Sequence, residues 1–250
     1  MSINIYRYMT TLTQSNERII VIDKGLAMNT RQIILLTVTL LSAAVGGFGQ
    51  GPAGKLENTR VAKGNSLVSA GEPKLKLKFG KEFKYAGGQT FILYNVARAE
   101  QHFYVDADDN GRISRLYWIQ FEGYLPGNDH KYDYSKSQGR VTINGLNFYA
   151  DAWARNHDPS QVRAGSDGDK AQEFLASKGY TFKSGEFIME RLVHMVDASN
   201  RSELMIIYLE GLPDGQTAAD YLPNGKDAAR WPQVANGLLA RAKQGMKIEL

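Results

Sequence analysis

Residues 116–124 read Leu-Tyr-Trp-Ile-Gln-Phe-Glu-Gly-Tyr, an aromatic-rich run that is typical of a β-strand. Successive side chains of a strand point to opposite faces. One face would carry Tyr117, Ile119 and Phe121, and the other would carry Leu116, Trp118, Gln120, Glu122 and Tyr124. A strand that is apolar on both faces is either central between two layers or has a ligand on one side. The sequence leaves both interpretations open.

Other runs with alternating or β-branched residues predict a series of strands around this one. We expect strands at residues 74–79, 89–97, 102–106, 113–124, 140–143, 147–154, 186–196 and 203–210. A polar turn at residues 108–111 separates the predicted strands 102–106 and 113–124, and a polar turn at residues 199–202 separates the predicted strands 186–196 and 203–210. Such short turns favour antiparallel pairing of the strands that they connect.

Two helices are predicted late in the chain. Residues 167–178 follow a capping residue, Ser166, and end before Gly179. Residues 232–244 begin at a proline, which is tolerated in a first turn, and end before Gly245. Strands in runs with only two helices favour the α+β class. We therefore expect an antiparallel β-sheet meander with one mid-chain helix and a C-terminal helix packed on the sheet.

The N-terminal part indicates export. Residues 33–48 carry no charge, follow Arg31 and end in small residues, which is the pattern of a signal peptide. We expect residues 28–49 to be the signal, with cleavage before Gln50, and residues 1–27 to be an extension of the gene model upstream of Met28. An uncleaved membrane anchor is the alternative. The chain has no cysteine, which excludes disulfides and a lipoprotein anchor.

The segment after the expected cleavage site, residues 50–73, is rich in small and polar residues and is predicted to be a flexible linker. Residues 74–250 should then form a single α+β domain. Its first strand alternates lysines with apolar residues, which is typical of an edge or outer strand whose lysines face water. The net charge is +4 for the whole chain and about +2 after residue 49, too low to predict nucleic-acid binding.

No cofactor motif occurs, and the histidines have no zinc-ligand spacing, so we expect neither a cofactor nor a structural metal. The turn at residues 106–113 resembles the opening of a calcium loop but has Tyr117 where the bidentate glutamate belongs. A plain hairpin turn is the favoured interpretation.

Two sets of candidate site residues follow. A catalytic hypothesis pairs His194, as general base, with Glu190 or Glu122 as the orienting carboxylate, and it requires a hydrogen bond between them. A binding hypothesis places a small amphipathic ligand on an aromatic sheet face. Its candidate residues are Trp118, Tyr117, Gln120, Tyr124 and Trp153.

We therefore expect a periplasmic or secreted bacterial protein, most simply a non-catalytic module that binds a small molecule or a protein partner of unknown identity. The alternatives are an enzyme, a hydrolase or isomerase with a histidine and carboxylates in a cavity, and an envelope-associated structural protein. The last requires an uncleaved N-terminal helix, and only then do we expect contact with a membrane.

Overall fold

The computed structural model describes residues 58–158 and 162–250, which all belong to the unit Lys55–Leu250. The predicted extension 1–27 and signal 28–49 lie outside the described residues, as does the first part of the predicted linker. Within the described ranges, no helix is long and apolar enough to cross a membrane.

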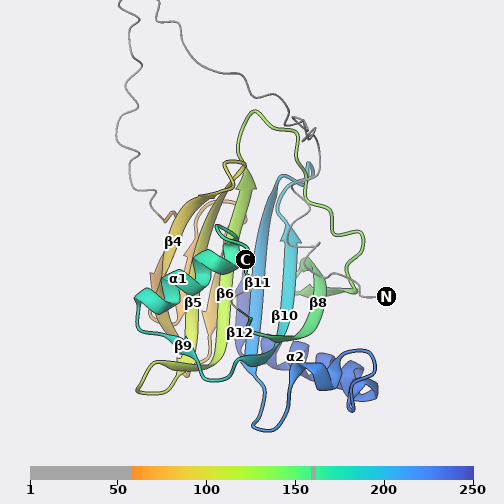
Figure 1. The fold of residues 1–250 in the computed structure, drawn as a ribbon. Helices are drawn as coiled ribbons and strands as arrows, with labels where there is room; N and C mark the ends of the chain where they lie inside the picture. The colour runs from red at the N-terminus through yellow and green to blue at the C-terminus, as the bar shows by residue number, and fades with distance from the viewer. Residues whose placement is uncertain (1–57, 159–161) are drawn as a thin grey trace, which may run out of the picture. The chain divides into compact units, whose positions relative to one another are not determined.

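A large, mostly antiparallel sheet forms the centre of the fold (Figure 1). Its strands lie in the order β4 (Lys84–Leu93), β5 (Ala97–Ala107), β6 (Arg112–Tyr124), β11 (Ser202–Gly211), β10 (Glu186–Met195), β8 (Leu146–Asn156) and β7 (Gly139–Ile143). The short β9 (Thr181–Phe182) pairs in parallel with β6. The sheet thus consists of two antiparallel runs, β4 to β6 and β7 to β11, which meet where β6 pairs with β11.

A second, four-stranded sheet packs against the first. Its order is β1 (Val61–Lys63), β2 (Ser66–Ser69), β3 (Leu75–Phe79) and β12 (Met246–Glu249). Two sequence-based expectations need correction here. The linker was expected to extend to Pro73, but β1 and β2 lie before that residue and Leu67 is fully buried. The lysine-bearing strand β3 is not an edge strand, because it pairs with β2 on one side and β12 on the other.

The predicted helices are confirmed, and with them the α+β class. Helix α1 (Asp167–Ser177) begins at Ser166, whose hydroxyl oxygen accepts a hydrogen bond from the Asp169 amide at 3.1 Å. The chain leaves α1 through Gly179 at φ +80°, a conformation that glycine adopts without strain. Helix α2 (Trp231–Gln244) has its proline in the first turn and is followed by Gly245. Short 3-10 helices η3 (Ala218–Tyr221) and η4 (Ala228–Arg230) precede it.

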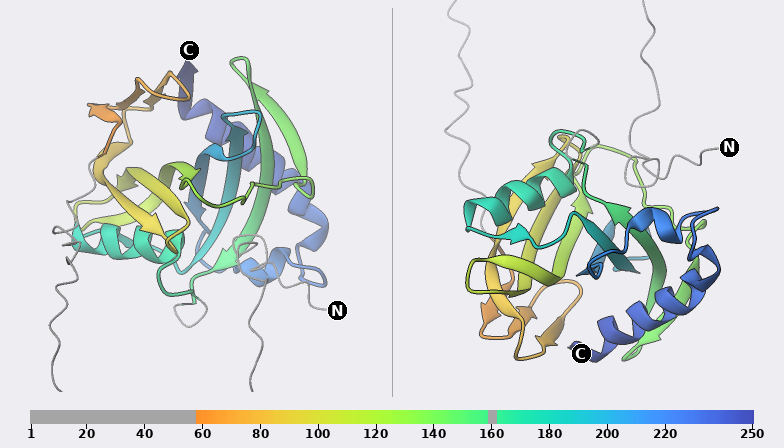
Figure 2. Two further views of the ribbon diagram at one scale, coloured as in Figure 1. Left: turned by 90° about the horizontal axis from the view of Figure 1, so that it is seen from above. Right: turned by 60° about the horizontal axis from the view of Figure 1, so that its bottom comes forward.

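The two faces of the large sheet are covered differently (Figure 2). We call them the α1 face and the α2 face. The α2 face packs against the small sheet, η3 and α2, and the Tyr117 hydroxyl donates a hydrogen bond to the Ala242 carbonyl of α2 at 2.7 Å. The α1 face packs against Ala171 and Leu175 of α1, with Trp118 among the covered residues. Burial on both sides explains why residues 116–124 are apolar on both faces.

One buried carboxylate fastens the start of the small sheet to the large one. Glu100 of β5 is fully buried on the α2 face. Its two oxygens accept hydrogen bonds from the Thr59 amide (2.8 Å) and hydroxyl (2.6 Å), from the Arg60 amide (2.8 Å) and guanidinium (3.1 Å), and from His102 Nε2 (3.0 Å). Burial alone would raise the pKa of Glu100, but the hydrogen bonds from His102, Thr59 and Arg60 outweigh it and hold the pKa well below its usual range.

We predict that Glu100→Gln lowers the free energy of unfolding by about 3–5 kcal/mol, because it leaves the buried Arg60 guanidinium without its charge partner. In the wild type this contribution should be lost as the pH falls below the ordinary glutamate range, since the folded-state pKa is depressed. Urea unfolding monitored by tryptophan fluorescence measures both effects. Glu82→Gln, at a carboxyl that is 38% exposed, is the control. Equal stability of the two variants would contradict the assignment.

Candidate functional site

A groove with a volume of about 700 Å³ opens where β8 and β10 diverge. The ladder between these strands ends at the pair Tyr149 and Val193, and beyond it β8 continues alongside β7 while β10 runs into the turn before β11. The groove is lined by residues of β7, β8, β10 and that turn, among them Arg140, Thr142, Phe148, Tyr149, His194 and Met195. Its volume is in the range of pockets that hold small organic molecules.

His194 is held in one orientation within this groove. Its Nδ1 lies 3.0 Å from the carbonyl oxygen of Asn147, and because a carbonyl only accepts, Nδ1 must carry the proton. In the neutral ring, Nε2 is then an acceptor, and no described residue forms a hydrogen bond with it. The imidazole lies 5.6 Å from the ring of Phe148, centroid to centroid. The groove therefore offers a hydrogen-bond acceptor next to the Phe148 ring, which is itself buried in the core at 1% exposure.

Arg140 also lines the groove, and its guanidinium has several contacts. It lies over the ring of Tyr149, 3.8 Å from the centroid, and donates to the carbonyl oxygens of Gly139 (3.0 Å) and Tyr134 (3.4 Å). The rings of Tyr149 and Tyr134 are in contact, with centroids 5.3 Å apart. These contacts restrict a side chain that would otherwise be mobile in water.

A second polar feature is buried on the α1 face. Glu122 of β6 and Glu203 of β11 are direct cross-strand partners, and they are only 8% and 4% exposed. We call them the carboxyl pair. Two tyrosines from the segment between β6 and β7, residues 125–138, donate to them: Tyr132 to Glu122 at 2.8 Å and Tyr134 to Glu203 at 2.9 Å. We call this segment the strap.

Glutamine side chains extend the carboxyl pair toward α1. Gln120 donates to Glu122 at 2.5 Å, Gln101 donates to Gln120 at 2.8 Å, and Gln89 donates to Gln101 at 2.8 Å. Gln101 also donates to the Asp167 carbonyl at the start of α1. Each amide thus satisfies its neighbour, which is the condition for burying a polar network in an apolar layer.

The charges in this layer favour protonated carboxyl groups. Burial raises the pKa of Glu122 to about 7, with a further contribution from the charge of Asp167. Burial and the neighbouring Glu122 raise the pKa of Glu203 well above its usual range. Arg191, the nearby cation, is already paired with Asp151 at 2.8 Å. The carboxyl pair therefore retains at least one proton at neutral pH.

The structure does not bring the predicted catalytic residues together. Glu122 lies on the α1 face, whereas Glu190 and His194 lie on the α2 face, and among the described residues no hydrogen bond joins His194 to either glutamate. Glu190 is 3% exposed, and no described residue forms a hydrogen bond with its carboxyl group. Burial and the charge of Asp151 raise the pKa of Glu190 to about 8. The hydrogen bond that the catalytic hypothesis requires is absent.

The predicted ligand-binding residues are divided between the two faces. Trp118 and Gln120 are buried beside the carboxyl pair, and the Trp118 indole donates to Gln120 at 3.1 Å. Tyr124 stacks on Tyr132 of the strap with ring centroids 4.4 Å apart, and Trp153 lies 4.9 Å from the Arg191 guanidinium. Tyr117 points to the opposite face, under α2. These side chains are engaged in internal packing, so the groove is the better candidate for ligand binding.

Sequence reasoning missed Arg140, Phe148 and Tyr149 as groove residues, and it missed Glu203 as the partner of Glu122. The available signal for Glu203 was a carboxylate at the start of an apolar run, Leu204–Leu209, which is unusual for a buried strand. No local pattern marks the groove, because it exists only where two strands separate.

We predict that Glu203→Gln, which mimics the protonated carboxyl, unfolds like the wild type at about pH 5 but is more stable than the wild type by roughly 1–3 kcal/mol at about pH 9. The sign follows from the raised folded-state pKa: unfolding releases the proton above the ordinary glutamate pKa of 4.5, so wild-type stability falls as the pH rises. Urea titrations across this range test it. Glu190→Gln serves as an independent comparison on the other face. A difference that does not change with pH would refute the protonated state assigned to Glu203.

No protein-family model matches this chain, and searches of curated proteins and of solved structures find no significant match. A function must therefore be inferred from the geometry of the site itself.

Proposed function

We propose that the protein is a non-catalytic module that binds a small amphipathic molecule in the groove between β7, β8 and the β10–β11 turn. The observation that carries this proposal is the groove itself, with a volume of about 700 Å³ and a mixed lining of aromatic, aliphatic and fixed polar groups. Small-molecule sites in proteins combine mainly apolar walls with a few polar groups that fix orientation.

The lining favours a ligand with a flat or aliphatic body and a hydroxyl or amine donor. Tyr149 supplies a partly exposed ring and Met195 an adaptable apolar wall, whereas Phe148 is buried. The Nε2 acceptor of His194 suits a donor group on the ligand. Arg140, already fixed over a ring, favours an acceptor or a negative charge at the rim.

Two observations favour binding over catalysis at this groove. The orienting partner of His194 is a backbone carbonyl, and the buried glutamates that could assist it lie elsewhere. The one serine or threonine in the described lining, Thr142, donates its proton to the Asn147 side chain at 2.8 Å rather than to a base. Asp197, the carboxylate in the lining, accepts hydrogen bonds from the Ser199 and Arg201 amides and none from His194. A histidine that is hydrogen-bonded to neither a nucleophile nor a carboxylate is better suited to hydrogen bonding than to proton-transfer chemistry.

We also propose that the protein works outside the cytoplasm, in the periplasm or after secretion. Support comes from the signal pattern in residues 28–49. Every described strand and helix lies C-terminal to Gly49, so cleavage there would remove none of them.

We predict that Ala198→Trp, at an exposed turn residue that lines the groove, abolishes binding of the small molecule without loss of folding. Native mass spectrometry of protein recovered from cells should show a non-covalent adduct on the wild type and none on this variant. Ala219→Trp is the matched control, because Ala219 is also exposed and lies in η3, which packs near the opposite ends of β8 and β10. It should keep the adduct.

An adduct that survives Ala198→Trp would place the ligand elsewhere. A wild type that carries no adduct, and whose melting temperature does not change with a panel of phenols and alkyl alcohols, would refute the binding proposal.

We predict that expression from Met28 in a bacterial host yields a periplasmic protein whose mass corresponds to a chain that begins at Gln50. Leu36→Arg introduces a charge into the apolar segment and should leave the precursor uncleaved in the cytoplasm, whereas Thr30→Ala should be exported normally. Intact-mass analysis of the cell fractions measures this. A wild-type protein found only in the membrane fraction at its uncleaved mass would favour the anchor instead.

A further inference from the structure

The outward face of the small sheet gathers lysines that are far apart in the sequence. Directly paired residues of neighbouring strands point to the same side of a sheet. The register places Lys63, Ser66, Lys78 and Lys247 in one row across all four strands. A second row consists of Val61, Val68, Lys76 and Glu249. We call these two rows the lysine face.

The lysine face is open to solvent. The inward neighbours on these strands, such as Leu67, Leu77 and Ile248, are buried in the core, so the alternate positions point outward. The side chains of Lys76 and Lys78 are 39% and 43% exposed. Lys63 and Lys247 are exposed, and no ion pair to either is found in the described part of the chain.

Protection of a sheet edge explains at most Lys63 and Lys247, which lie on the edge strands β1 and β12. Edge strands often carry lysine to prevent pairing with other chains. However, β3 is an interior strand of the small sheet, and two of its lysines lie on a face rather than at an edge. Lys78 and Lys247 are direct cross-strand partners, an arrangement in which like charges repel. Glu249, 2.5 Å from Lys78 and 4.0 Å from Lys76, is the one acidic residue in the two rows.

We infer that the lysine face binds the anionic surface of a lipid bilayer. Four lysines and one glutamate give the two rows a net charge of +3, and each basic residue near an anionic membrane adds to its affinity. The face belongs to a sheet and also carries Val61, which is 53% exposed. A sheet face with an exposed apolar side chain fits a headgroup layer better than it fits the curved phosphate backbone of a nucleic acid. This inference is independent of the groove.

The test is sedimentation of the protein, as recovered from cells, with vesicles of phosphatidylcholine alone or of phosphatidylcholine mixed with phosphatidylglycerol. We expect binding to the mixed vesicles only, and loss of that binding at about 1 M salt, where the Debye length is about 3 Å. The double variant Lys63→Glu/Lys247→Glu should bind the mixed vesicles at least about tenfold more weakly, because it lowers the net charge of the lysine face by four. Lys63→Arg/Lys247→Arg should bind like the wild type.

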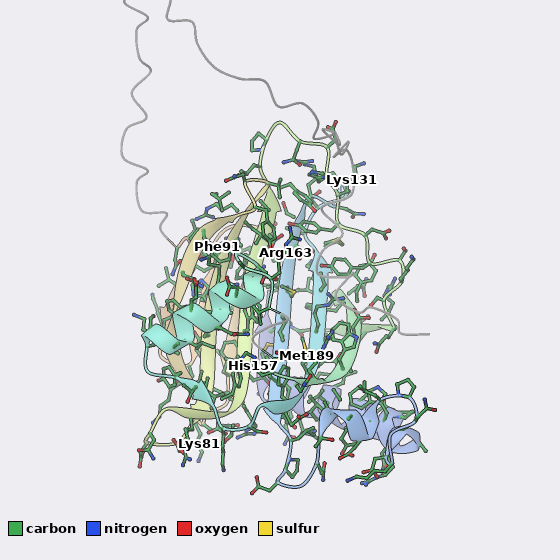
Figure 3. All side chains as sticks on the ribbon, in the orientation of Figure 1. Lys81, Phe91, Lys131, His157, Arg163 and Met189 are labelled. Carbon is green, nitrogen blue, oxygen red and sulfur yellow. The ribbon has the colours of Figure 1, made fainter. Side chains whose placement is uncertain are left out.

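The matched control is Lys131→Glu/Lys136→Glu, which makes the same change in net charge in the strap. Figure 3 shows Lys131 and Lys81, the latter just beyond β3, at opposite ends of the molecule. Equal loss of binding in both double variants would show that net charge alone acts, and would overturn the inference. So would equal binding to neutral and anionic vesicles, which would indicate the apolar N-terminal segment, or binding to RNA with no binding to anionic vesicles.

Discussion

The pairing of β6 with β11 is the constraint on which the rest of the structure depends. It joins two antiparallel runs that are otherwise separate, and it places Tyr117 beside Tyr208 and Ile119 beside Ile206 in the core under α2. The same register forces the carboxyl pair together on the other face. A shift of one residue would exchange the two faces of a strand, so the apolar matches fix the register even though it buries two carboxyl groups. The protonated state of that pair follows from this packing.

Buried carboxyl groups in this fold act in opposite directions with pH. Glu100 is surrounded by donors and favours its ionised form, whereas Glu122, Glu190 and Glu203 favour their protonated forms because burial is the dominant cause. Acid therefore weakens the attachment of β1 to β5, and alkali weakens the layer under the strap. Maximum stability should fall between these limits, on the mildly acidic side of neutrality, rather than at the isoelectric point of about 9.1.

Local signals in the sequence predicted much of the fold and little of the site. Helix α1 was marked by its capping serine and α2 by its first-turn proline, and both by a following glycine. The alternation in residues 116–124 correctly divided Tyr117 from Trp118. Strands β1, β2 and β12 were missed because each is three or four residues long and is stabilised by pairing rather than by its own pattern. Alternation also put His194 and Glu190 on one face, but the opposite orientation of Glu122 depends on the order of strands in the sheet, which no local pattern reveals.

Tyr134 connects the carboxyl pair with the groove, two features that no sequence pattern links. Its hydroxyl donates to Glu203, its ring contacts Tyr149 at the groove, and its carbonyl accepts from Arg140. A ligand that displaces Arg140 or Tyr149 must therefore act on the side chain that stabilises the carboxyl pair. Any such coupling is reciprocal: if ligand binding changes the proton affinity of Glu203, then protonation of Glu203 changes the ligand affinity by the same factor. The strap thus contacts two residues of the groove lining as well as covering the sheet.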